Sequence, residues 1–165
     1  ISNLVFLTLI GATMGIQPII GYNIGAKLHR RAHKVELAAI CGATAFAVLA
    51  FAGVQLFPEA FISLFAGSDP RVREIGTYAL HRYFIFLPLM GLQVLGSGYF
   101  QASGKPIKSL ALGLSRQFII LIPLLLILPS LWGLDGVWSA QPVADVIAFA
   151  ITALLLWREM RAPAT

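Results

Sequence analysis

Residues Leu37 to Pro58 read LAAICGATAFAVLAFAGVQLFP and contain no Asp, Glu, Lys, Arg or His. A helix needs about 20 predominantly apolar residues to cross the hydrocarbon core of a bilayer, and this run is long enough. Two further runs lack the same five residue types, from Ile1 up to Lys27 and from Tyr83 to Gly104. These runs predict membrane-spanning helices.

The composition of the whole chain fits a membrane protein better than a soluble domain. Only 12% of the 165 residues are charged, against about 25% in soluble domains. Hydrophobic residues make up 58% of the chain, and the mean hydropathy is +0.84. A soluble domain of this length could not bury so much apolar surface. We therefore predict an all-α integral membrane protein with about five transmembrane helices.

Several other classes of protein are disfavoured. The net charge is +5, but aromatic residues do not interleave with the basic ones, so we expect no nucleic-acid partner. The lone Cys41 cannot form an internal disulfide or a Cys-x-x-Cys metal site. His29 and His33 flank two arginines without an acidic neighbour, which favours a solvated loop over a metal site. We expect no metal and no cofactor, and the absence of a catalytic motif favours a protein that is not an enzyme.

We expect five spans, separated by turn signals and charged segments. The expected spans are residues 1–26, 37–57, 83–102, 109–131 and 137–157. Phe61–Arg82 mixes charged and apolar residues around the turn signal Gly67-Ser68-Asp69-Pro70, and Arg71–Arg82 reads as an amphipathic helix leading into the third span. Ile1 already lies in a hydrophobic run without a charged segment before it, which is unlike a signal peptide. We expect the chain to be the C-terminal piece of a longer protein.

The basic residues predict how the spans are oriented. With five spans, one side of the membrane receives Lys27, Arg30, Arg31, Lys34, Lys105, Lys108, Arg116, Arg158 and Arg161. The other side receives Arg71, Arg73 and Arg82. Cytoplasmic loops carry the excess of Lys and Arg, so this asymmetry predicts a cytoplasmic C-terminus.

Asp145 lies about ten residues into the fifth expected span, near the bilayer midplane. An ionised carboxylate there costs at least a few kcal/mol, so it should face a bundle interior or a wet cavity. Gln141 precedes it by one helical turn and Thr152 follows it by two, which gives this face a polar stripe. A structural hydrogen-bonded Asp and a group that responds to protons or cations are both compatible with this pattern.

Polar residues in the other spans add candidates for a substrate or ion pathway. Gln93, Ser97 and Gln101 recur every fourth residue on the third span, which favours a cavity wall over contacts that only join helices. Arg116, with Gln117 beside it, either extends its head group to the interface or pairs with a carboxylate or with carbonyls at a helix end. In the first span, two Gly-x-x-x-Gly motifs permit close helix contact, and Gln17 precedes the helix-bending Pro18. Asn23 of the same span completes the candidate set.

Ordered motifs along nearly the whole chain resemble the multidrug and toxic compound extrusion (MATE) family, nearest to its bacterial MepA-like branch. They are GIQPIIGYNIGAK at 15–27, the helix 84–101 followed by ASGKP to Pro106, SRQFIILIP at 115–123 with LP at 128–129, and GLDGVW at 133–138 followed by QPVAD at 141–145. The resemblance implies helices eight to twelve of a twelve-helix antiporter, hence most of one six-helix lobe. The seventh helix and the N-terminal lobe would belong to the missing part of the same chain.

The resemblance also implies a function, a location and partners. Such transporters export cationic or amphipathic drugs through the bacterial inner membrane in exchange for protons or sodium. Sodium-coupled members carry acidic residues on the seventh and tenth helices, whereas the tenth-helix equivalent here has Gln93 and Gln101 and no carboxylate. The coupling ion therefore stays open. The alternatives are a flippase for lipids or lipid-linked oligosaccharides, disfavoured because Arg116 is the only cation deep in a span, and a membrane scaffold that transports nothing.

Overall fold

The computed structural model describes residues 2–66 and 70–161 and consists of helices there. In chain order they are α1 (Ser2–Gly25), α2 (His29–Leu56), α3 (Pro58–Ala66), α4 (Pro70–Tyr83), a 3₁₀ turn (Leu87–Leu89), α5 (Met90–Ala102), α6 (Pro106–Leu114), a π-helical segment (Ser115–Leu121), α7 (Ile122–Trp132) and α8 (Leu134–Arg161). Five stretches of these residues are long and apolar enough to cross a membrane: Asn3–Gly25, His29–Leu56, Ile75–Ala102, Pro106–Trp132 and Leu134–Arg161. The predicted all-α membrane fold is confirmed.

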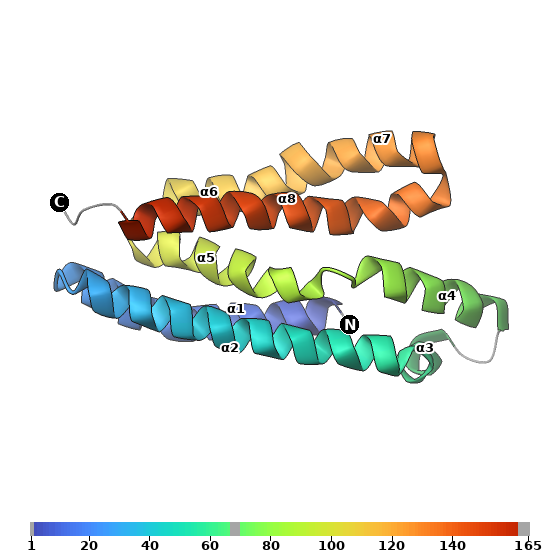
Figure 1. The fold of residues 1–165 in the computed structure, drawn as a ribbon, viewed down its shortest axis with the longest axis horizontal. Helices are drawn as coiled ribbons and strands as arrows, with labels where there is room; N and C mark the ends of the chain where they lie inside the picture. Colours follow the sequence, from blue (N-terminus) through green and yellow to red (C-terminus); the bar gives the residue numbers. More distant parts are fainter. Residues whose placement is uncertain (1, 67–69, 162–165) are drawn as a thin grey trace.

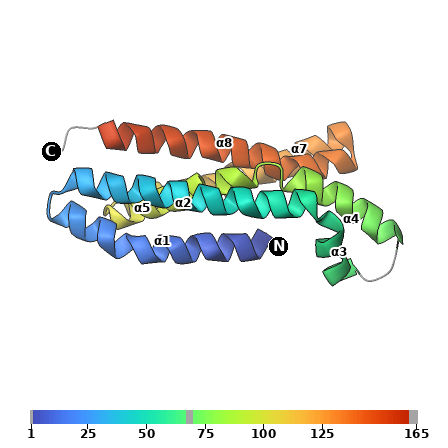
Figure 2. The same ribbon diagram turned by 60° about the horizontal axis from the view of Figure 1, so that its bottom comes forward.

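The helices run side by side in an elongated bundle (Figure 1). α1 and α2 form an antiparallel pair on one side, α6, α7 and α8 lie on the other, and α5 lies between them. Figure 2 shows the same order from a second direction, with α8 and α1 on opposite sides of α5. The turn between α1 and α2, the start of α6 and the end of α8 lie at one end of the bundle, whereas α3 and α4 lie at the other. The basic residues near the α1–α2 turn, the start of α6 and the end of α8 therefore gather at the same end of the bundle.

The second helix begins at His29, earlier than the span expected from Leu37. Arg30, Arg31 and Lys34 consequently lie on its first turns, and the loop expected around His29 and His33 is helical instead. Residues 29–41 contain no Gly or Pro, so nothing in their backbone interrupts a helix. The turn before α2 is made by Lys27, whose φ of 59° is left-handed, and Leu28 N–H closes it on the Asn23 carbonyl at 2.7 Å.

Prolines shape the third and fourth spans. Between α4 and α5 the chain passes through a 3₁₀ turn that contains Pro88, which has no N–H for a helical hydrogen bond. In the fourth span, Pro123 is the second residue of α7, which begins where the π-helical segment ends. Its ring would crowd the carbonyl one turn earlier in a regular α-helix, and the wider π turn relieves this contact. The segment that carries Arg116 therefore departs from α-helical register.

Close helix contacts in the bundle depend on glycines of α5. A Cβ added at Gly91 would lie 3.0 Å from the Thr44 backbone nitrogen of α2, and one at Gly98 would lie 2.1 Å from Thr13 Cγ2 of α1. At Gly96 it would lie 2.7 Å from Thr152 Cγ2 of α8. The motifs expected to serve this purpose in the first span do not: Gly11, Gly15 and Gly25 have no such atom within 4 Å, and Gly21 has only the Ala102 carbonyl at 3.5 Å.

Candidate functional site

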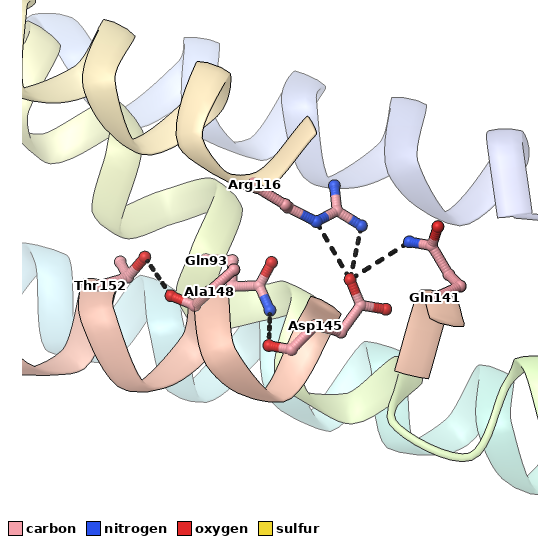
Figure 3. Close-up of polar contacts among 6 residues, drawn as sticks. All are labelled: Gln93, Arg116, Gln141, Asp145, Ala148 and Thr152. Atoms are coloured by element: carbon pink, nitrogen blue, oxygen red, sulfur yellow. Dashed lines mark hydrogen bonds and ion pairs between the residues drawn. The ribbon is translucent and has the colours of Figure 1, made fainter. Parts of the chain in front are cut away.

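The most deeply buried ion pair in the described part of the chain joins Arg116 to Asp145 of α8 (Figure 3). Nε and Nη2 of Arg116 donate hydrogen bonds of 3.0 and 2.6 Å to the same carboxylate oxygen, Oδ1 of Asp145. The side chains are 20% and 6% exposed. Charges at this depth in a membrane protein need a partner, and here each residue is the partner of the other. The sequence left three interpretations of Arg116 open, and the structure shows the one in which Arg116 pairs with a carboxylate.

Two amide side chains fix the position of Asp145. Gln141, one turn earlier on α8, donates to Oδ1 at 3.3 Å. Gln93 of α5 donates its Nε2 to the backbone carbonyl of Asp145 at 2.6 Å, and Gln93 itself is buried. The site thus joins α5, the π-helical segment and α8, which lie far apart in sequence.

Two consecutive residues of the π-helical segment line the same cavities. Arg116 and Gln117 both contribute to two cavities of about 270 Å³ each, and Phe6 of α1 lines both as well. The irregular backbone therefore lines a cavity, as is usual at membrane depth.

The first of these cavities combines charge with aromatic and apolar walls. It is lined by Asn3, Phe6, Tyr83, Phe84, Leu87, Met90, Arg116, Gln117, Leu121, Gln141 and Asp145. Apolar and aromatic surface with a few converging polar groups is typical of pockets for small molecules. The described residues offer no group of three or more His, Cys, Asp or Glu side chains that could hold a metal ion.

The polar stripe of α5 serves two purposes. Gln93 and Ser97 line the second 270 Å³ cavity, and Ser97 also lines a smaller cavity of about 200 Å³ together with Gln101. Each residue contacts a different helix as well: Ser97 Oγ lies 3.0 Å from Ser109 Oγ of α6, and Gln101 accepts a hydrogen bond from Gln17 of α1 at 3.3 Å. The stripe therefore joins helices and also lines consecutive cavities beside α5.

The remaining predicted residues lie apart from the ion pair. Gln17 lines the 200 Å³ cavity. Asn23 is buried near the end of α1 and donates its amide to the Ile19 carbonyl of its own helix at 2.7 Å. Thr152 is buried, donates to the Ala148 carbonyl at 2.8 Å and lines the second 270 Å³ cavity (Figure 3).

Sequence reasoning misses a buried carboxyl group, Glu36 of α2. Its exposure is 0%, and neither Oε1 nor Oε2 has a hydrogen-bond partner. Because the charge-free run begins at Leu37, the sequence alone leaves Glu36 at the flank of the span. The buried residues of α2 are Ala32, Glu36, Ile40, Ala43, Ala47 and Val54, and their helical spacing is the signal that could have placed Glu36 on the packed face.

Comparison with known proteins identifies the family. Residues 1–127 match the MatE family. Multidrug export protein MepA of Staphylococcus haemolyticus is 30% identical over 144 residues, which cover 87% of this chain and 31% of that protein. The FAD transporter of Shewanella oneidensis is 22% identical over 151 residues, which cover 89% and 32%. The chain thus spans about a third of the length of these curated relatives.

Solved structures have the same fold. The MATE multidrug transporter DinF-BH, solved in complex with a ligand, matches with a TM-score of 0.86 at 44% identity, over 93% of this chain and 34% of that one. An outward-facing multidrug resistance transporter of the MATE family matches in fold with a TM-score of 0.89 at 22% identity, over 96% and 36%. The ordered motifs, the five apolar helices and these matches agree, and the chain belongs to the MATE family of membrane transporters.

Proposed function

We propose that this chain forms most of one lobe of a secondary active antiporter that exports cationic or amphipathic drugs in exchange for protons or sodium ions. The observation that carries the proposal is the buried Arg116–Asp145 pair in the wall of a cavity with aromatic sides. The similarity to multidrug export proteins and to a solved multidrug transporter supports drugs as the substrate class. The other lobe of the complete chain would close the cavity.

The ion pair suggests how an ion and a drug could compete. As long as Arg116 holds Asp145, the site is neutral and attracts no further cation. A proton or a sodium ion at the carboxylate would weaken the pair and release the guanidinium, while a cationic drug would compete with Arg116 for the same charge. Arg116 is the more exposed partner, at 20%, and it lies in the irregular segment, so it is the partner that we expect to move.

Transport of phosphate-bearing substrates is less well supported. One relative is named an FAD transporter, and a flippase for lipid-linked sugars would likewise need positive charge in its cavity. The cation that faces the cavities, Arg116, is already neutralised by Asp145. A scaffold without transport would have no use for consecutive cavities beside α5 into which polar side chains project.

We further propose that the protein spans the bacterial inner membrane with its C-terminus in the cytoplasm. The support is the nine-to-three asymmetry of the basic residues, nine of which lie on one side of the expected spans. Figure 1 places the turn between α1 and α2 and the end of α8 at the same end of the bundle, as this orientation requires.

The test uses the complete transporter in proteoliposomes with ethidium as a fluorescent cationic substrate. A proton gradient and a sodium gradient are imposed separately, and dye movement is followed by fluorescence. We expect export with one gradient, a weaker response to that gradient in Asp145→Asn, and wild-type export in the matched variant Asp135→Asn. Asp135 also lies on α8 but is exposed and hydrogen-bonded to Tyr78. A wild-type protein that moves no cationic dye under either gradient would overturn the proposed function.

A further inference from the structure

Glu36 is a fully buried acid without a hydrogen-bond partner, unlike two other acids that the helices of this bundle carry. Asp145 pairs with Arg116, and Glu159 of α8 binds Lys105 and Lys108. Both oxygens of Glu36 are enclosed and unbonded. An ionised carboxylate without a partner in an apolar interior costs several kcal/mol. In this conformation the group is therefore stable only when a proton or another cation neutralises it.

Neither oxygen of Glu36 has a hydrogen-bond partner on the helices that pack against α2. α1 presents the buried Ile20 and Asn23 along this part of the α1–α2 pair. α5 presents Tyr99, which is 2% exposed and interacts electrostatically with Glu36. α3 and α4 pack at the opposite end of α2 (Figure 1).

On α2 itself, His33 precedes Glu36 by three residues and so lies on the same face. Its ring centroid is 6.1 Å from that of Tyr99, and it is partly exposed. Glu159 is within electrostatic range of His33 and Tyr99, but its carboxylate is occupied by the two lysines. His33 is thus a partly exposed titratable group on the same face of α2 as Glu36.

A proton suits this site better than a metal cation. Sodium requires several oxygen ligands, whereas Glu36 is fully enclosed and neither of its oxygens is part of a hydrogen-bonded network. A single carboxyl group suffices for a proton, and once protonated it can donate its O–H to a carbonyl oxygen. Full burial means that the proton can leave only when the contacts of α2 with α1 and α5 loosen.

We propose that Glu36 is a second proton-binding site, which takes up and releases its proton through His33 at the end of the bundle where α2 begins. The proton passes from the carboxyl O–H of Glu36 to a ring nitrogen of His33 and then to water, and it returns by the reverse route. The proposal rests on the antiport function proposed above and identifies the proton as an ion that this lobe carries. Burial of Glu36 in one conformation and release in another would tie proton movement to the packing of α1, α2 and α5.

The experiment uses the complete transporter and the variant Glu36→Gln, whose amide has nearly the same shape and cannot carry the proton. Glu59→Gln, on the exposed face of α3, is the matched control. Infrared difference spectroscopy in H₂O and D₂O should show the carbonyl bands of protonated carboxyl groups in wild type and Glu59→Gln. One of these bands should be lost in Glu36→Gln, and this band, unlike any from Asp145, should remain in Asp145→Asn. Ethidium binding should be the same in wild type, Glu59→Gln and Glu36→Gln, whereas export driven by a proton gradient should fall in Glu36→Gln to the level of protein-free liposomes.

The outcomes separate this proposal from the antiport proposal. If wild type exports ethidium and Glu36→Gln does so at the same rate with the same infrared spectrum, Glu36 is not a proton site, although the antiport function stands. If wild type exports nothing, the antiport proposal fails, and the infrared band alone then decides whether Glu36 holds a proton. His33→Gln should keep the band and slow its exchange with D₂O, and an unchanged exchange rate would overturn the role of His33.

Discussion

Arg116 and Asp145, 29 residues apart in sequence, form two hydrogen bonds that meet at one carboxylate oxygen. Gln141 donates to this same Oδ1, so it accepts all three side-chain bonds drawn to this carboxylate in Figure 3. The arrangement differs from a bidentate pair, in which the guanidinium engages both oxygens. It concentrates the donors on Oδ1 and leaves Oδ2 as the oxygen to which a proton or a cation would bind.

The first prediction concerns the pH dependence of export. Asp145→Asn removes the titratable group and keeps a side chain that can accept from Arg116 through its carbonyl oxygen. We expect the complete transporter to fold and bind ethidium while its export rate becomes nearly independent of pH. Export rates in proteoliposomes over a pH series measure this, with Asp135→Asn as the control. A variant whose pH profile matches that of wild type would leave Asp145 with a structural role only.

The second prediction concerns the stability supplied by the ion pair. Arg116→Met leaves a buried carboxylate without its partner, and breaking a buried pair in this way costs about 3–5 kcal/mol. Adding Asp145→Asn removes the stranded charge, so the double variant should recover much of the loss. Thermal unfolding of wild type, both single variants and the double variant gives the coupling between the two sites. Additive effects would mean that the pair contributes little in the membrane.

The third prediction concerns the contact between α1 and α5. Gly98→Ala would place a Cβ 2.1 Å from Thr13 Cγ2, and overpacking of this kind costs about 1–3 kcal/mol. Thr13→Ser removes that methyl group, leaves the next nearest atom at 3.5 Å and keeps the hydroxyl that bonds to the Leu9 carbonyl. The combined variant should therefore unfold close to the wild-type temperature.

Gly15→Ala is the control for this contact, because an added Cβ there has no such atom within 4 Å. It should leave the unfolding temperature of the transporter unchanged. The packing described for α1 and α5 would be wrong if Gly98→Ala were as stable as Gly15→Ala, or if Thr13→Ser gave no rescue.

The fourth prediction concerns orientation in the membrane. Cysteines introduced as Arg31→Cys and Arg161→Cys, both at exposed positions, should be shielded from impermeant reagents added outside intact cells. Ser68→Cys, at a position outside the described residues, should be labelled. The reason is that the excess of basic residues stays on the cytoplasmic side. Labelling of Arg31→Cys from outside would reverse the topology.

The fold could be predicted because a run of about 20 residues without charge is long enough to cross a bilayer as a helix, and such runs can be counted directly in the sequence. The pair at the candidate site was harder, since nothing in the spacing of Arg116 and Asp145 shows that two helices bring them together. The π-helical segment that turns Arg116 inward depends on how Pro123 is accommodated, and several backbone solutions fit the same residues. The burial of Glu36 could not be predicted because this residue borders a basic segment in the sequence. Its burial follows from the packing of α2 against α1 and α5.

The fifth prediction separates the two roles of the polar stripe on α5. Gln93 is buried and binds the Asp145 carbonyl of α8 at 2.6 Å, whereas Gln101 is exposed and meets Gln17 across a cavity of about 200 Å³. Gln93→Leu would therefore remove a contact between helices, and we expect lower thermal stability and less protein in the membrane. Gln101→Leu should leave the amount of protein unchanged and alter which drugs are exported, because it removes only an exposed hydrogen bond of 3.3 Å to Gln17 and otherwise changes a cavity wall. Membrane abundance and drug-resistance profiles of cells expressing each variant measure the two effects. Equal loss of protein in both variants would mean that the whole stripe only joins helices, and that the cavities beside α5 are not part of the substrate pathway.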